Sequence, residues 1–284
     1  EQELFEGLEA KSVNCWPNVD FDIGAINNFL GKFFPAGFYY KTFMWPKSFW
    51  YKIYEPIIRK AAGFGAASIK HDKEKYEHKY EYCDLLITGS GPSGLASAYA
   101  AAQNGAKVIL AEDKSRFGGS LLTSEVTIGN QSGQEWAEKI ISELKSMPNV
   151  VVKNRSQVFG YYDHNMLVMS ERVSDHLPKT DKYIPKQRLW YIRAKEVVIS
   201  SGSIERPLVF GNNDVPGVML SSAAKEYLKI YGVLVGKKPL VFTNNDSGYE
   251  TAIEFKKNGI DPIVLDTRKD TNSEIIKEAK GLNI

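Results

Sequence analysis

The 284-residue chain has an ordinary globular composition, with 43% hydrophobic and 25% charged residues, which excludes a disordered chain, a collagen and a coiled coil. Its 36 basic and 34 acidic residues give a formal net charge of +2, so we expect no nucleic-acid partner. Two cysteines, Cys15 and Cys83, exclude a disulfide scaffold and a CxxC pair and favour a reducing, cytoplasmic setting. With no run of 18 apolar residues, we also expect no membrane partner.

The first region, residues 1–80, is predicted to be an aromatic-rich arm and linker. Prolines interrupt it and exclude long helices. Between residues 33 and 54 it carries Phe33, Phe34, Phe38, Tyr39, Tyr40, Phe43, Trp45, Phe49, Trp50, Tyr51 and Tyr54. So many large aromatic side chains must be covered, either by a neighbouring domain or by another subunit. The charged run 71–80 is predicted to be a solvated linker.

A dinucleotide-binding domain is predicted over residues 81–235. A short apolar strand at 84–88, a small-residue helix at 92–103 and a second apolar strand at 107–111 form a βαβ unit. Such a unit predicts a parallel sheet covered on both faces. The pattern then predicts a helix at 135–145, a strand at 149–153, an antiparallel excursion at 157–162, 166–171 and 188–193, and a buried strand at 195–200.

A second, truncated Rossmann-like unit is predicted over residues 236–284. Its strands lie at 238–243 and 262–266, on either side of a helix at 247–258. The turn after its first strand reads Thr-Asn-Asn-Asp-Ser-Gly and lacks the GxG pattern. Asn and Asp side chains crowd a pyrophosphate, and Asp246 adds a negative charge. This favours a structural unit, with a second dinucleotide site as the alternative.

The strongest chemical signal is the GxGxxG sequence from Gly89 to Gly94, which follows a predicted strand and opens a predicted helix. Gly89 permits the tight turn, Gly91 lets the backbone approach a pyrophosphate, and Gly94 lets the helix pack on the strand. Pro92 and Ser93 begin the helix, whose N-terminus attracts phosphate. The alternative is a glycine-rich turn without a ligand.

An acidic residue, Glu112, ends the second strand of this unit. Its carboxylate would accept hydrogen bonds from a ribose and repel a 2′-phosphate, which favours NAD or FAD over NADP.

Two further segments are predicted to line the same site. After Asp113 comes a loop in which Lys114 and Arg116 could meet a phosphate or cover an adenine, unless it is a plain surface loop. Gly118, Gly119 and Ser120 follow, and a glycine pair there lets the chain pass beside a diphosphate. The strand ending near Gly202 brings bare backbone to the cofactor, as in two-domain flavoprotein reductases, unless it is an ordinary turn.

No catalytic or metal-binding residue can be nominated. The four histidines are scattered, and they are more typical of surface residues than of bases or ligands. No nucleophile–base pair, HExxH or Walker pattern occurs, so any redox step would be carried out by a cofactor.

Longer motifs carry a family resemblance. The runs 35–46 (PAGFYYKTFMWP) and 54–63 (YEPIIRKAAG) resemble the α subunit of heterotetrameric sarcosine oxidase, as do GSGPSG, FGYYD at 159–163, VPGV at 215–218 and TNND at 243–246. The resemblance covers essentially the whole chain. It implies an α/β, Rossmann-like FAD/NAD(P)-binding fold of the two-dinucleotide-domain flavoprotein type, with an aromatic N-terminal arm.

The resemblance also implies a function. The family's complex of α, β, γ and δ subunits oxidises sarcosine to glycine, passes the one-carbon unit to tetrahydrofolate and reduces oxygen to hydrogen peroxide. FAD lies in the β subunit, FMN at the α–β boundary, and non-redox NAD in the α subunit. Carried over to this sequence, NAD contacts fall at Ser93, Glu112, Asp113, Lys114 and Ser120, with an adenine contact near Val158.

The family's ferredoxin-like upstream and folate-binding downstream regions are absent here, and both ends of the sequence resemble cuts, so we expect a fragment that is inactive alone. Two alternatives remain open. One is a self-sufficient FAD-dependent NAD(P)H oxidoreductase, against which the NND turn and the missing cysteine pair argue. The other is an α-type subunit of another amine or proline dehydrogenase.

Overall fold

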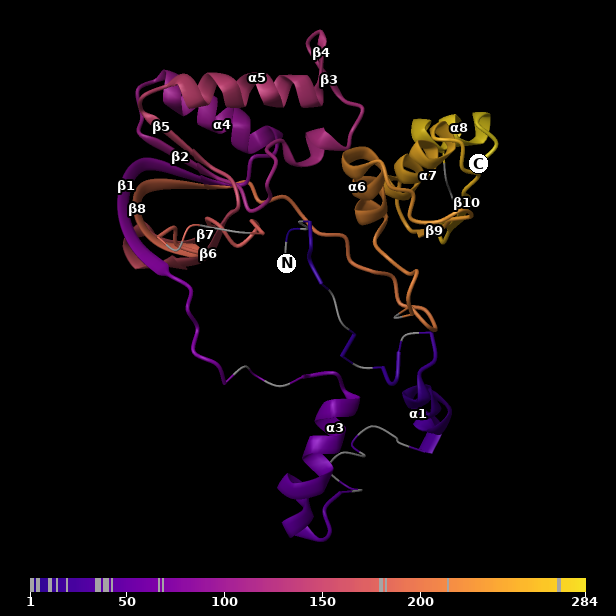
Figure 1. Cartoon of the computed structure of the whole chain (residues 1–284). Coiled ribbons are helices and arrows are strands. Elements are labelled where there is room, and N and C mark those ends of the chain that lie inside the picture. The colour runs from indigo at the N-terminus through magenta and orange to yellow at the C-terminus, as the bar shows by residue number, and fades with distance from the viewer. Residues whose placement is uncertain are drawn as a thin grey trace. The chain divides into compact units, whose positions relative to one another are not determined.

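The computed structural model describes residues 3, 6–9, 12, 13, 15–18, 20–33, 37, 41, 43–65, 67, 69–178, 181, 183–213, 215–269 and 272–284 (Figure 1). The chain forms two units. One contains residues 1–75 and 174–184, and the other contains residues 76–173 and 185–284.

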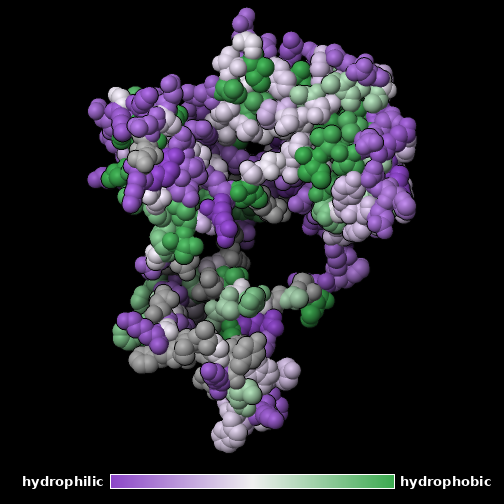
Figure 2. All heavy atoms as spheres, turned by 180° about the vertical axis from the view of Figure 1, so that it is seen from behind, coloured by the Kyte–Doolittle hydropathy of each residue, from purple (hydrophilic) through white to green (hydrophobic). Residues whose placement is uncertain are grey.

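The first unit consists of short helices, as the prolines predict. They are η1 (Ile23–Ala25), α1 (Ile26–Leu30), η2 (Gly31–Phe33), η3 (Lys47–Phe49), the π-helical turn η4 (Trp50–Tyr54) and α3 (Glu55–Ala61). None of the residues described between 3 and 75 is buried. Hydrophobic residues accordingly lie at the surface of this unit (Figure 2).

The aromatic arm has a small centre at Tyr54. Its ring lies 5.2 Å from that of Phe43 and 6.2 Å from that of Phe49, and its hydroxyl donates to the Trp45 carbonyl at 3.1 Å. The Trp45 and Tyr51 side chains are each 83% exposed. The predicted aromatic positions Phe34, Phe38, Tyr39 and Tyr40, and the side chain of Phe33, lie outside the described residues. What covers the arm stays a prediction.

The second unit is built on a mixed six-stranded sheet of order β5-β2-β1-β8-β7-β6. Neighbours among β5, β2, β1 and β8 are parallel, whereas β7 pairs antiparallel with both β8 and β6. The strands are β1 (Tyr76–Thr88), β2 (Val108–Ala111), β5 (Val150–Lys153), β6 (Ser156–Tyr162), β7 (Met166–Arg172) and β8 (Gln187–Ile199). A small hairpin is formed by β3 (Thr127–Ile128) and β4 (Gln131–Ser132).

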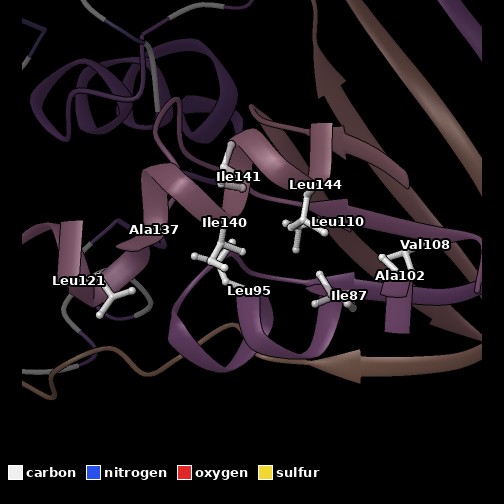
Figure 3. Packing of buried hydrophobic residues seen from close by; sticks show 11 residues of the cluster. Ile87, Leu95, Ala102, Val108, Leu110, Leu121, Ala137, Ile140, Ile141 and Leu144 are labelled. Carbon is white, nitrogen blue, oxygen red and sulfur yellow. The ribbon is translucent and has the colours of Figure 1, made fainter. Parts of the chain in front are cut away.

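Helices α4 (Pro92–Gln103) and α5 (Gly133–Ser146) cover one face of the parallel part. The small side chains of α4 let it approach the sheet, and a capping box between Ser132 and Glu135 begins α5. Figure 3 shows the resulting core, in which Leu95 and Leu144 meet Ile87 and Leu110. This core fixes the N-terminus of α4 at the end of β1.

The opposite face is covered by the antiparallel strands. Leu86 and Ile109 of the parallel strands share a buried cluster with Met169 and Ile192. The sheet curls so that its last strand, β6, lies beside the end of β2. The N–H of Ser156, at the start of β6, donates to the carbonyl of Glu112, just past β2, at 2.7 Å. The expected covering of both faces is therefore met by helices on one side and strands on the other.

Two predicted features differ from the structure. The linker predicted at 71–80 is wrong from Tyr76 onward, because β1 begins there and pairs in parallel with β8. The strands predicted at 188–193 and 195–200 are one continuous strand, β8, and residues 195–200 are half-buried or exposed, not buried as predicted. Cross-strand contacts stabilise this extension, including the Glu77–Arg188 ion pair at 2.7 Å and the stacked rings of Tyr80 and Tyr191 at 5.1 Å.

The predicted second βαβ unit is present. Strands β9 (Leu240–Thr243) and β10 (Ile263–Asp266) are parallel and joined by α7 (Ser247–Lys257), and α8 (Glu274–Gly281) follows. Helix α6 (Ser221–Tyr231), which we assigned to the first domain, shares a small core with α7. The domain boundaries stay predictions. None of the helices in the described ranges is long and apolar enough to cross a membrane.

Candidate dinucleotide-binding site

Two glycines of the GxGxxG turn are required by the fold itself. Gly89 has a φ of +97°, and a methyl group there would lie 2.4 Å from the Ser200 carbonyl oxygen. At Gly94 a methyl group would lie 2.0 Å from the carbonyl oxygen of Gly89. These contacts hold the first turn of α4 against the ends of β1 and β8, so packing alone accounts for both glycines.

Gly91 is different, because nothing in the protein requires it. Its φ is −65°, which any residue can adopt, and a methyl group there would meet no protein atom within 4 Å. Gly91 is the N-cap of α4 and faces open space at the positive end of a 12-residue helix. This open space beside a helix N-terminus is where a pyrophosphate would approach the backbone if the predicted site binds one.

Glu112 lies at the end of β2 and is only 6% exposed. Its Oε2 accepts from the N–H and the hydroxyl of Ser90 at 2.9 and 2.5 Å, and its Oε1 accepts from the N–H of Lys114 at 3.0 Å. These bonds use three of the roughly four acceptor positions that a carboxylate offers. Burial, and then the hydrogen bond with Asp113, raises the pKa of Glu112.

Ser90 is a site residue that our sequence reasoning missed. Besides donating to Glu112, its hydroxyl accepts from the N–H of Gly118 at 3.1 Å. It therefore joins the turn, the end of β2 and the second glycine loop. A hydroxyl side chain between the first two glycines of the motif was the available signal.

The second glycine loop lies directly against the turn. The N–H of Gly118 donates to the carbonyl of Ser90 at 3.1 Å. Gly119 has a φ of +53°, and a methyl group there would lie 2.9 Å from the Cα of Gly91. Ser120 follows in the short helix η5 (Gly119–Leu122) and is exposed, as are Pro92 and Ser93. The structure thus brings the turn, Glu112 and the glycine pair together.

The charged side chains of the loop have other contacts. Asp113, Lys114 and Arg116 are exposed. The Lys114 ammonium forms an ion pair with Glu226 of α6, and the carbonyl of Asp113 accepts from the Arg172 guanidinium at 2.7 Å. A contact of Lys114 or Arg116 with a phosphate stays a prediction.

The end of β8 closes the turn from the other side. The Ser200 hydroxyl donates to the carbonyls of Thr88 and Gly89 at 2.9 and 3.0 Å. Gly202 follows with a φ of +73° and open space beside its Cα. Val158, predicted near an adenine, lies in β6, and its side chain packs on the buried cluster shared by the parallel and antiparallel strands. Its contact with a ligand remains a prediction.

The corresponding turn of the second βαβ unit is filled by its own side chains. Asn245 accepts from the N–H and the hydroxyl of Ser247 at 2.9 and 2.6 Å. Arg268 bridges Asp246 and Asp266, each at 2.8 Å, and lowers the pKa of Asp266 to about 2. This turn is thus held by its own side-chain hydrogen bonds and ion pairs, and whether it also binds a nucleotide stays a prediction.

The chain is similar to known proteins in sequence and in fold. Residues 84–166 match the family model "FAD dependent oxidoreductase". Over 268 residues, or 94% of the chain, the sequence is 49% identical to sarcosine oxidase subunit alpha of Rhizobium meliloti (strain 1021). The chain is a homologue of part of that subunit. It is also 36% identical to the same subunit of Corynebacterium sp. (strain P-1) over 78% of the chain. It spans only 27% and 23% of these sarcosine oxidase α subunits.

The fold is the α/β fold of FAD-dependent oxidoreductases, with a mixed central sheet. L-proline dehydrogenase from P. horikoshii is similar with a TM-score of 0.55 and 23% identity, over 74% of this chain and 40% of that one. At this identity the likeness concerns the fold alone. The family model and the sarcosine oxidase homologues agree with the resemblance seen in the motifs.

Proposed function

We propose that this sarcosine oxidase α homologue binds NAD at the N-terminus of α4. The turn from Gly89 to Gly94 would hold the pyrophosphate, Glu112 would accept from the adenosine ribose, and residues 118–120 would border the phosphates. The observation that carries this proposal is Gly91, a glycine that neither backbone conformation nor packing requires. A nicotinamide or a flavin supplies hydride transfer when bound. The resemblance favours a non-redox role for NAD here.

We further propose that the chain serves a sarcosine-oxidising complex. Homology at 49% identity to a sarcosine oxidase α subunit supports this role. The substrate sarcosine, the acceptors tetrahydrofolate and oxygen, the FAD and FMN of the complex, the β, γ and δ subunits and a cytoplasmic location all belong to this proposal. The chain's own residues would bind a nucleotide and contact partner subunits, and we assign none of them to catalysis.

FAD is the second candidate for the site. The match of residues 84–166 to the FAD dependent oxidoreductase model favours it. FAD and NAD share the adenosine diphosphate half that the turn would hold, so the glycines and Glu112 serve both equally.

The nucleotide released when the intact protein is denatured decides between them. We expect mass spectrometry to find NAD in the supernatant, in proportion to the protein. The matched control is the Gly91→Ala variant, in which we expect the nucleotide to be lost. Release of FAD in place of NAD would support the second candidate. Wild-type protein that releases no nucleotide at all would contradict a dinucleotide site.

A further inference from the structure

The cation beside Glu112 is tied to a distant helix. Lys114 follows Glu112 by two residues, and its N–H donates to Oε1 of that carboxylate. Its side-chain ammonium forms an ion pair with Glu226 of α6, 112 residues further along the chain. Burial acts to lower the pKa of Lys114, and the hydrogen bond and charge of Glu226 outweigh it, so that the pKa is raised. The cation is therefore charged and already partnered.

Helix α6 holds Glu226 in a fixed place. One turn after Glu226, Lys229 contacts Glu125 at 3.4 Å and the buried Glu254 of α7 at 2.8 Å. The apolar side of α6, with Ala224 and Leu228, packs on Phe255 of α7 and on Ile260, which follows that helix. Because the helix is anchored by both polar and apolar contacts, Glu226 presents its carboxylate to Lys114 from a rigid element.

This arrangement bears on which dinucleotide the site accepts. NADP differs from NAD by a phosphate on the 2′-oxygen of the adenosine ribose, and sites that accept it place a cation near the acidic position after the second strand. Lys114 occupies that place in the sequence. Its ammonium is nevertheless paired with Glu226, while the buried Glu112 adds a negative charge of its own.

We propose that Glu226 is a positioning residue that sets dinucleotide specificity. By holding the Lys114 ammonium, it withholds the cation that a 2′-phosphate needs, and it adds to the negative charge around the ribose. Glu112 excludes the phosphate directly and Glu226 excludes it through Lys114. This inference rests on the proposed function, a dinucleotide bound at the N-terminus of α4.

The test measures NAD and NADP affinity on the intact protein after bound nucleotide has been removed. We expect Glu226→Gln to tighten NADP binding about tenfold, because a freed lysine gains a charge-assisted contact with phosphate. NAD affinity should change by less than about twofold, because NAD carries no charge at that position. Adding Lys114→Ala to the variant should abolish the gain. A merely structural role of Glu226 would move both affinities together.

Glu250→Gln is the matched control. Glu250 pairs with Lys225 at 2.9 Å and is exposed on α7, so this substitution removes the same charge without freeing Lys114. An equal gain of NADP affinity in this control would overturn the proposal, as would an unchanged NADP affinity in Glu226→Gln. Both results require wild type to bind NAD. A wild type that binds neither dinucleotide would instead overturn the proposed function.

Discussion

Replacing Gly91 by alanine separates ligand binding from folding. The residue has a φ of −65°, and a methyl group there meets no protein atom within 4 Å, so the fold accepts alanine without strain. Gly→Ala at a compatible position stabilises a protein by about 0.4–1 kcal/mol through the unfolded state. We therefore expect the melting temperature of Gly91→Ala, measured without nucleotide, to stay level or rise by a few degrees.

Nucleotide affinity should fall steeply in the same variant. A methyl group in the open space displaces the pyrophosphate from the first N–H groups of α4. Losing two charge-assisted hydrogen bonds, each about 1.5–3 kcal/mol, weakens binding by roughly 3 kcal/mol or more, which is at least about 100-fold. Titration calorimetry with NAD measures this loss. Wild-type affinity in a folded Gly91→Ala variant would refute the assignment of Gly91 to the phosphate site.

The contrasting variant is Gly94→Ala, in which the methyl group would lie 2.0 Å from the Gly89 carbonyl oxygen and 2.6 Å from the Ser200 hydroxyl. Overpacking of this kind costs about 1–3 kcal/mol, so its melting temperature should fall by several degrees. Gly236→Ala, an exposed glycine whose methyl group would also meet nothing, controls for the substitution itself. Equal melting temperatures for Gly91→Ala and Gly94→Ala would contradict the packing argument.

Three further predictions concern charge, assembly and reactivity. Because burial raises the pKa of Glu112, its carboxylate is protonated at a higher pH than that of an ordinary glutamate. The preference for NAD over NADP should therefore narrow as the pH is lowered, and calorimetric titrations that find a constant preference would argue against this. Replacing Trp45 and Trp50 by alanine should lower the yield of the complex with partner subunits on size-exclusion chromatography. The nucleotide content should stay unchanged, because both residues lie outside the turn from Gly89 to Gly94. An undiminished yield would show that the two tryptophans do not contact a partner. Burial raises the pKa of Cys83 to about 11, so iodoacetamide should label Cys15 first in the native protein and both cysteines after denaturation. If mass spectrometry found the two cysteines labelled equally in the native protein, the Cys83 thiol could not be buried.

Local sequence patterns predicted the parts of the fold that depend on local contacts. The apolar strand, the glycine turn and the small-residue helix follow one another within 20 residues, so their periodicity and turn chemistry suffice to place them. The meeting of Gly91 with the loop at Gly119 was also predictable in outline, because both follow parallel strands that end at one edge of a sheet.

The remaining features depend on partners far away in the sequence. Tyr76–Tyr80 is charged and aromatic, which is typical of a linker by composition, and only its pairing with Gln187–Tyr191 makes it a strand. The ion pair of Lys114 with Glu226 joins residues 112 positions apart. Neither segment carries a local signal for the other, so one sequence cannot reveal such pairs.

The pairing of β1 with β8 also has a consequence for folding during synthesis, because the two strands lie far apart in the sequence. The carbonyl of Gly89 receives its hydrogen bond from Ser200, 111 residues later. At synthesis rates of about 5–20 residues per second, the β8-facing edge of β1 waits roughly 5–20 seconds on the ribosome before its partner emerges. An unpaired apolar strand edge is a template for other chains. We therefore expect solubility during expression to depend on the protection of this nascent edge as well as on the stability of the finished sheet.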